Sequence, residues 1–242
     1  MRVQHFSALL LGGLATACPL APRQSASVTA TAPASSATGT GSDSGVTAAA
    51  LQAILPSSGS CGGAQFPDEC RTAEQAAPFI AKACADLSKA ECAATIALMG
   101  YESADLKFKH NVVPGVPGQG TANMMSPTVS THFCPHHERP KHALTATSSQ
   151  FVSEYATTLF GASAVAGKSP ADVLALVTPD EHNFGSAAWF LTTKCSADVR
   201  SQLKTGSDAG WAAYNNQCIN GGADTFTDRT KYWTRAKAAL GV

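Results

Sequence analysis

The stretch "SKAECAATIALMGYES", Ser88 to Ser103, carries the clearest helix signal in the chain. Ser88 and Glu91 have the spacing of a capping box, in which each side chain accepts a hydrogen bond from a backbone N–H at the start of a helix. We therefore expect a helix from Lys89 to about Ser103. Its apolar positions recur at spacings of four and three residues, so they should share one buried face; these positions are Cys92, Ile96 and Met99.

Glu102 is the most informative residue of this helix, because it lies three residues beyond Met99, on or beside the buried face. Burial disfavours the charged carboxylate, which raises the pKa and favours the protonated acid. We therefore single out Glu102 as a candidate catalytic acid. The alternative is that Glu102 turns to solvent in the last helical turn and pairs with Lys107 or Lys109.

The loop after the helix contains "NVVPGVPGQGTANMMSP", Asn111 to Pro127. Its glycines and prolines favour close turns that hold their shape. Gln119, Thr121 and Asn123 supply neutral donors and acceptors, the chemistry that binds sugar hydroxyls and amides. We expect these three residues to bind a substrate; the alternative is an ordinary turn-rich connection.

The beginning of the chain has the pattern of a secretory signal peptide over residues 1–17. Arg2 is followed by a short apolar run and then by small residues up to Ala17. A lipoprotein acylated at Cys18 is the alternative. Residues 18–50 are rich in Ser, Thr, Ala and Gly, with almost no large apolar side chains, which predicts a disordered linker. One domain should occupy residues 51–242.

The composition narrows the range of partners. The chain has 242 residues, is 44% hydrophobic and carries 17 basic and 17 acidic residues. This charge balance gives no reason to expect binding to nucleic acid or to an anionic membrane surface, and no segment approaches the roughly 20 apolar residues that a membrane span needs. We expect a secreted, extracellular monomer with no nucleic-acid or membrane partner.

The cysteines draw attention to residues 129–150. Seven cysteines follow Cys18, an odd number for an oxidising compartment, and Cys134 lies in this segment with His132, His136, His137 and His142. A metal site and a plain loop are two interpretations. Our third hypothesis is a translated, unspliced fungal intron, because the segment's ends can be encoded as splice donor and acceptor sequences. Its removal leaves six cysteines, of which Cys195 and Cys218 could join two helices, while the other four allow three pairings.

The rest of the domain shows helical patterns separated by Gly, Ser and Thr. Ser169 and Pro170, for example, mark the start of one helix. No run of alternating strands is present. We therefore expect a mainly α, disulfide-stapled fold with at most a small sheet between about Lys107 and Gly120.

Two motifs resemble the lysozyme-like superfamily of goose-type lysozymes and lytic transglycosylases. These are "ALMGYES" around Glu102 and "GQGTANMM" from Gly118 to Met125. "NFGSAAWFLTTKC" and "FTDRTKYWTRAKAALG" are similar to a group of fungal secreted lysozyme-like proteins. The resemblance covers Cys61 to Val242 apart from residues 129–150, and it implies a lysozyme-like α+β domain. Met125 and Ala122 depart from the residues usual at those places.

The resemblance implies a secreted glycan-cleaving enzyme of the muramidase or lytic transglycosylase type, with no cofactor and no metal. Glu102 would protonate the glycosidic oxygen, and the substrate would be a cell-wall polysaccharide, peptidoglycan first and chitin second. Asp105 and Asp180, with Glu181 next to the latter, are candidates for a second carboxylate that contacts substrate. The alternative function is a non-catalytic secreted glycan-binding protein or effector with the same fold.

Overall fold

The structure is a computed structural model that describes residues 44–113, 115, 117–125, 150–219 and 223–242. The predicted signal peptide, most of the predicted linker and the suspected intron segment, including Cys134 and its four neighbouring histidines, lie outside the described residues. The first described helix, α1 (Ala48–Ile54), begins a little before the predicted domain boundary at residue 51.

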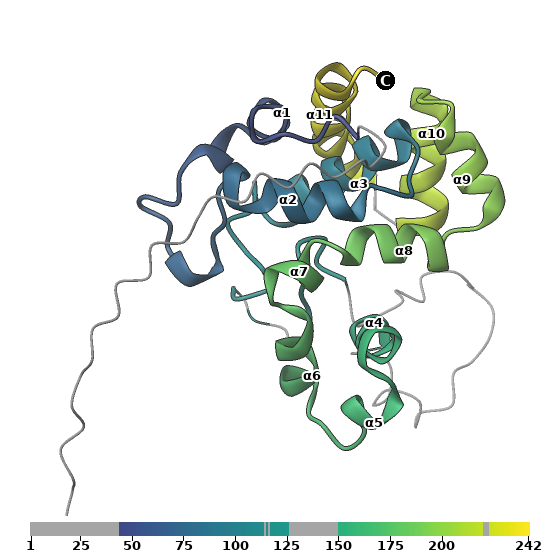
Figure 1. The fold of residues 1–242 in the computed structure, drawn as a ribbon. Coiled ribbons are helices and arrows are strands. Elements are labelled where there is room, and N and C mark those ends of the chain that lie inside the picture. The colour runs from purple at the N-terminus through teal and green to yellow at the C-terminus, as the bar shows by residue number, and fades with distance from the viewer. Residues whose placement is uncertain (1–43, 114, 116, 126–149, 220–222) are drawn as a thin grey trace, which may run out of the picture. The chain divides into compact units, whose positions relative to one another are not determined.

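Helix α3 (Lys89–Glu102) lies at the centre of the main group of helices (Figure 1). The predicted capping box is confirmed, because Ser88 Oγ accepts from the Glu91 amide while the Glu91 carboxylate accepts from the Ser88 amide. The carboxylate of Glu91 is buried and also accepts a hydrogen bond from Arg200 Nε at 2.9 Å. The start of α3 is therefore fixed both by its own cap and by a distant charged partner.

The helices around α3 supply most of the core. They are α2 (Ala73–Ala83), α8 (Ser186–Lys194), α9 (Ala197–Lys204), α10 (Asp208–Ala213) and α11 (Ala223–Leu240). A π-helix, Tyr214–Ile219, continues α10 where the sequence pattern predicted further α-helix. Trp211 and Trp233 stack with ring centroids 5.3 Å apart and are fully buried, so α10 and α11 share one rigid aromatic contact.

A second apolar cluster forms below α8 (Figure 1). It is built mainly from α4 (Gln150–Phe160) and α6 (Pro170–Val177), which are joined through α5 (Ala162–Val165). Helix α6 begins as predicted, with Pro170 in its first turn and Ser169 Oγ accepting from the Asp172 amide. Helix α7 (Asp180–Asn183) then leads the chain back to α8.

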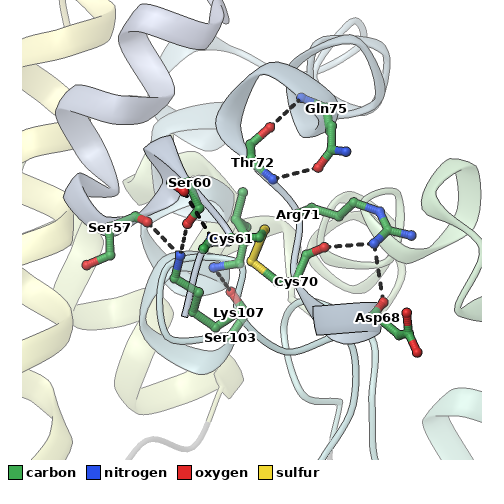
Figure 2. The surroundings of a disulfide bond; sticks show 12 residues. Ser57, Ser60, Cys61, Asp68, Cys70, Arg71, Thr72, Gln75, Ser103 and Lys107 are labelled. Atoms are coloured by element: carbon green, nitrogen blue, oxygen red, sulfur yellow. Dashed lines mark hydrogen bonds between the residues drawn. A yellow bond between two sulfur atoms is a disulfide. The ribbon is translucent and has the colours of Figure 1, made fainter. Parts of the chain in front are cut away.

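Three disulfides join described cysteines: Cys61 to Cys70, Cys84 to Cys92, and Cys195 to Cys218. The last confirms the expected link across α9 and α10. Around the first, the ammonium of Lys107 donates to the carbonyl oxygens of Ser57 and Ser60 (Figure 2). The disulfide and the lysine together hold the short segment before α2 against the chain that follows α3.

The mainly helical prediction is confirmed, whereas the α+β description is not. Within the described ranges there is no strand, and the region expected to hold a small sheet contains isolated bridges between His110 and Gly120 and between Gly120 and Met125. Thr121 and Met124 have positive φ angles, which turn the chain where a strand would extend it. No helix in the described part of the chain is long and apolar enough to cross a membrane.

Candidate acid–base site

Glu102 is the last residue of α3, and its partner is Arg229 of α11. Glu102 Oε1 accepts hydrogen bonds from Nε of Arg229, at 3.2 Å, and from Nη2. The two side chains are 19% and 9% exposed, so the ion pair is mostly shielded from water. The Arg229 guanidinium also lies over the ring of Tyr101, 5.1 Å from its centroid. The pair therefore ties the end of α3 to the C-terminal helix.

Two opposing effects act on the Glu102 carboxyl. Burial raises its pKa above the ordinary value, while the charge and hydrogen bonds of Arg229 lower it in part, and the net direction is upward. This direction agrees with the expectation from the helix face. Arg229 would also stabilise the carboxylate that remains when a proton leaves, so the arrangement suits a group that gives up and regains a proton.

The two lysines considered as partners of Glu102 lie elsewhere. Lys107 binds backbone carbonyls, and Lys109 Nζ forms an ion pair with Asp180 at 3.4 Å. The alternative in which Glu102 pairs with one of them at the surface is therefore wrong. The partner of Glu102 is instead the better-shielded guanidinium of Arg229.

The backbone turns sharply just after Glu102. Ala104, Asp105 and Leu106 have φ angles of 50°, 59° and 66°, a left-handed run that is costly for residues with a Cβ. Ser103 stabilises the run, because its hydroxyl donates to the Met99 carbonyl at 2.6 Å and accepts from the Leu106 amide at 2.9 Å. The turn brings the following loop across the end of α3.

Glu102 borders a cavity of about 330 Å³ whose wall also includes Phe108, Gln119 and Met124. A second cavity of about 560 Å³ lies between the loop and α6, with apolar side chains on its wall; these belong to Val112, Pro117, Ala171, Leu174 and Ala175. Both cavities are bordered by His110, Asn111 and Val112, so they adjoin. We call the two cavities together the groove: it is more polar around Glu102, where polar and apolar side chains mix, than against α6, where it is largely apolar.

The three loop residues predicted to bind substrate divide into two groups. Gln119 borders the cavity of Glu102, where its Oε1 accepts from Asn111 Nδ2 at 2.7 Å. Thr121 and Asn123 are buried, and Asn123 Oδ1 accepts from the hydroxyls of Thr121 and Ser186. Neither of these two is among the described residues that line the groove. Their contacts fasten the loop to α8.

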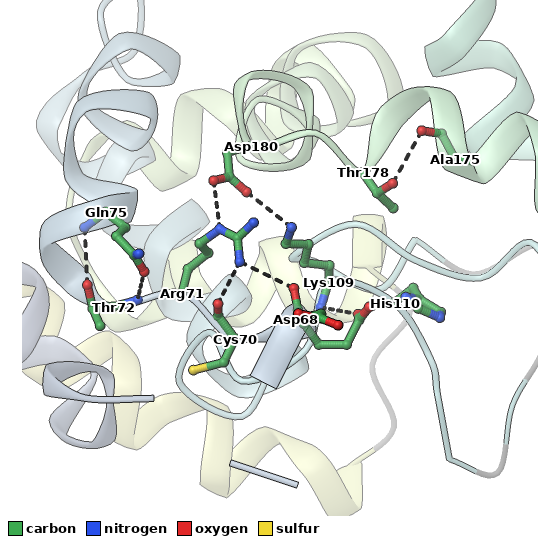
Figure 3. A network of polar contacts seen from close by, with 11 residues as sticks. Asp68, Cys70, Arg71, Thr72, Gln75, Lys109, His110, Ala175, Thr178 and Asp180 are labelled. Atoms are coloured by element: carbon green, nitrogen blue, oxygen red, sulfur yellow. Dashed lines mark hydrogen bonds and ion pairs between the residues drawn. The ribbon is translucent and has the colours of Figure 1, made fainter. Parts of the chain in front are cut away.

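The candidate second carboxylates also have structural partners. Asp105 is buried, and its Oδ2 accepts from the Ser57 amide at 2.8 Å. Asp180 pairs with Arg71 Nε at 2.7 Å and with Lys109, as Figure 3 shows. Glu181 is exposed and lies 3.2 Å from His182. Of the predicted set, the structure brings Glu102 and Gln119 together in the groove.

Two residues of the site were not found from the sequence. Arg229 lies 127 residues after Glu102, and no local pattern marks it as the partner. His110 borders both cavities, and its position beside the turn-rich loop was an available signal. Gly120 makes room for it, because a Cβ at that position would lie 2.8 Å from the Cβ of His110.

The polar atoms around Glu102 include one without a partner. Arg229 Nη1 is buried and has no hydrogen-bond partner among the residues that the structure describes. In the same ranges there is no group of three or more His, Cys, Asp or Glu side chains that could hold a metal ion. The described groove offers a proton at Glu102, a histidine and amide groups that can bind a ligand's oxygen atoms.

Comparison with known proteins gives one similar protein and no family. No protein-family model matches the chain, and no solved structure matches it. A bifunctional dioxygenase–epoxy alcohol synthase of Fusarium oxysporum is 39% identical over 174 residues. The match covers 69% of this chain and 12% of that protein. The chain therefore spans about an eighth of the length of the curated relative that it matches.

This comparison contradicts the lysozyme-like resemblance. The relative is named as a dioxygenase and an epoxy alcohol synthase, and neither name describes the cleavage of a glycan. The identification with lysozyme-like proteins is therefore corrected, and with it the glycan-directed function drawn from it for peptidoglycan or chitin. The short motifs around Glu102 and Gly118 do not establish a function by themselves, because function depends on the whole site.

Proposed function

We propose that this chain binds an oxygenated, partly apolar small molecule of the epoxy alcohol class and opens its epoxide ring with water, with Glu102 as the proton donor. The observation that carries the proposal is the shielded Glu102 carboxyl at the polar end of the groove, where burial raises its pKa. The chemical class comes from the relative's name, which describes the synthesis of an epoxy alcohol. The relative's own two activities are not transferred to this chain.

The reaction needs an acid because the epoxide oxygen is a poor leaving group until it is protonated. Glu102 gives its proton to that oxygen as a carbon–oxygen bond of the ring breaks, and the electron pair of the bond stays on the oxygen. A water oxygen forms a new bond to the carbon and loses one proton. The product carries two hydroxyls where the epoxide was, and the net change is the addition of one water.

The groove fits both parts of such a ligand. Its apolar wall along α6 can bury a hydrocarbon segment, which contributes about 0.8 kcal/mol for each buried CH₂ group. At the other end, Gln119 and Asn111 offer amide groups beside Glu102. In an epoxy alcohol whose hydroxyl is on the carbon next to the epoxide, both oxygens can occupy the polar end at once.

The test is incubation of the full chain with aliphatic epoxy alcohols of short and long hydrocarbon chains, followed by mass spectrometry. We expect products heavier by one water, carrying heavy oxygen when the reaction is run in ¹⁸O-labelled water. Glu102→Gln keeps the size of the side chain and removes the proton, so it should lower the rate by about 100-fold or more.

Glu74→Gln is the matched control, because Glu74 is exposed in the first turn of α2 and should leave the rate unchanged. Full activity of Glu102→Gln would refute the assigned role of Glu102. If the parent protein converts none of the compounds, the proposed reaction is wrong.

A second candidate function is binding of the same ligand class without turnover. The ion pair between Glu102 and Arg229 favours it, because a carboxylate held by a shielded guanidinium can also serve as a fixed structural link. Calorimetric titration with the same compounds separates the two candidates. Binding without any product would support this second function.

We also propose that the protein acts outside the cell as a monomer. Three disulfides support an oxidising compartment, and the pattern of residues 1–17 remains the predicted export signal. The equal numbers of acidic and basic residues support the absence of nucleic-acid or membrane partners. Light scattering and the N-terminal sequence of protein recovered from culture medium test these points.

A further inference from the structure

His110 is held by a carboxylate that has no part in the proposed proton donation. Its Nδ1 lies 2.7 Å from Glu69 Oε2. The same carboxylate oxygen accepts from the backbone amide of Lys109 at 3.1 Å, so Glu69 binds both the ring and the adjoining backbone. The Glu69 side chain is mostly buried, whereas that of His110 is about one-third exposed toward the groove.

This contact determines which nitrogen of the neutral imidazole ring carries the hydrogen. When Nδ1–H donates to a carboxylate, the lone pair of the neutral ring is on Nε2, which can then accept a proton. The described residues provide no partner for Nε2. His110 borders the cavity that contains Glu102 and also the larger apolar cavity, where Glu69 is a wall residue. A proton donor and a carboxylate-oriented histidine thus face one ligand-sized space.

Several contacts fix the backbone around Glu69. Glu69 ends a 3₁₀-helix, Pro67–Glu69, and Cys70 follows directly with its disulfide to Cys61 (Figure 2). Arg71 then donates to the carbonyls of Asp68 and Cys70 and to the Asp180 carboxylate (Figure 3). The backbone on both sides of Glu69 is therefore fixed, as a residue that orients a base requires.

The charges around His110 come from three parts of the chain. Glu69 is the nearest anion, and Glu102 borders the same cavity from α3. Lys109 borders the larger cavity, but its ammonium is paired with Asp180, which Arg71 also neutralises in part. The direct partner of the ring is thus a carboxylate, which holds the ring in place and leaves Nε2 as the acceptor nitrogen.

We propose that His110, oriented by Glu69, is the general base that removes a proton from the attacking water; this rests on the proposed function. As the water oxygen bonds to the epoxide carbon, its O–H bond breaks and the proton moves to Nε2 of His110. The carboxylate left at Glu102 and the imidazolium at His110 then exchange a proton through solvent, which restores both groups. Glu69 is a positioning residue, because it acts through the ring.

The test compares His110→Asn with His182→Asn in the full chain. Asparagine at 110 can still donate to Glu69, but it offers no basic nitrogen, so kcat should fall by about 100-fold or more with little change in KM. His182 is the matched control, because it also lies against a glutamate, Glu181, yet borders neither cavity of the groove. Its substitution should leave kcat unchanged.

Two further readouts separate a base from a structural residue. The shape of the pH–rate profile should differ between the parent and His110→Asn, because a general base contributes to that profile. Free imidazole should restore part of the rate to His110→Ala and none to Glu102→Gln. Melting curves identify variants that fail to fold, and His110→Gln then replaces His110→Asn in the comparison.

The two proposals fail in different ways. If the parent is active, Glu102→Gln is inactive and the folded His110 variants are fully active, the base assignment is overturned and the proposed function stands. If folded His110→Ala loses activity that imidazole does not restore and its pH profile is unchanged in shape, a structural role replaces the base. If the parent opens no epoxide, both proposals are overturned together.

Discussion

Replacing Arg229 with methionine should destabilise the protein by an amount that increases with pH. Without the guanidinium, the shielded Glu102 carboxyl has to stay protonated in the folded state, whereas in the unfolded chain it ionises at its ordinary pKa of 4.5. Each pH unit above that value costs 1.36 kcal/mol, so the part of the penalty that comes from Glu102 ionisation cannot exceed about 3.4 kcal/mol at neutral pH. Near pH 4.5 this part of the penalty falls to about 0.4 kcal/mol.

The direction follows from the number of protons bound in each state. A carboxyl whose folded pKa is raised binds more protons in the folded state than in the unfolded state. The free energy of unfolding is therefore highest below the unfolded pKa and falls as the pH rises toward the folded pKa. Glu102 of the parent also has a raised pKa, but Arg229 opposes the shift, so the parent should lose less stability over the same range.

Urea unfolding at about pH 4.5 and at neutral pH measures the effect. Loss of the contact with Tyr101 adds a cost that is the same at both pH values. The matched control is the same change in a Glu102→Gln background, where the difference between the two pH values should vanish. Equal destabilisation by Arg229→Met at both pH values in the parent background would show that Arg229 does not control the ionisation of Glu102.

Two glycine substitutions test the packing that places the site. Gly100→Ala should lower the free energy of unfolding by about 1–2 kcal/mol, because its Cβ would lie 2.3 Å from Leu55 Cδ2 and 2.7 Å from the Tyr232 ring. This clash costs more than the gain of about 1 kcal/mol in helix propensity. Unchanged or increased stability in urea would contradict this prediction. Gly120→Ala should slow epoxide opening and lower the melting temperature, because its Cβ would lie 2.6 Å from Leu174 and 2.8 Å from His110. An unchanged rate would show that His110 does not need this position. Gly59→Ala is the control for both, since its Cβ would meet Gln52 no closer than 3.7 Å.

The local parts of the fold could be predicted from the sequence. The cap at Ser88 and Glu91, the start of α6 at Ser169 and the disulfide from Cys195 to Cys218 all depend on residues close in sequence or on cysteine number. Hydrogen bonds at a helix start need only the residues of the first turn, so their pattern is visible without the fold.

The partners of buried charges could not be predicted. Arg200 binds Glu91 from 109 residues away, and Arg229 binds Glu102 from 127 residues away. Both contacts exist because separate helices meet in the core, and no periodicity within one helix reports which helix its neighbour will be. The assumption that the partner of Glu102 would be close in sequence therefore pointed to the wrong cations.

The loop after α3 shows a second limit. Thr121 and Asn123 are small polar residues in a turn-rich segment, and such residues bind either a ligand or their own protein. Here they bind each other and Ser186, because the left-handed turns at 104–106 and at Thr121 direct them inward. No residue between 104 and 106 is glycine, so sequence propensity gave no sign of this turn.

An NMR titration of the Glu102 side-chain carboxyl carbon in the full chain, assigned by comparison with Glu102→Gln, shows most directly whether Glu102 can serve as a proton donor in the groove. We expect a titration midpoint above 4.5 and a change in the Glu102 signal when an aliphatic epoxy alcohol is added. A midpoint at or below 4.5, together with a signal that the ligand leaves unchanged, would contradict this expectation: Glu102 would then be an ionised structural partner of Arg229.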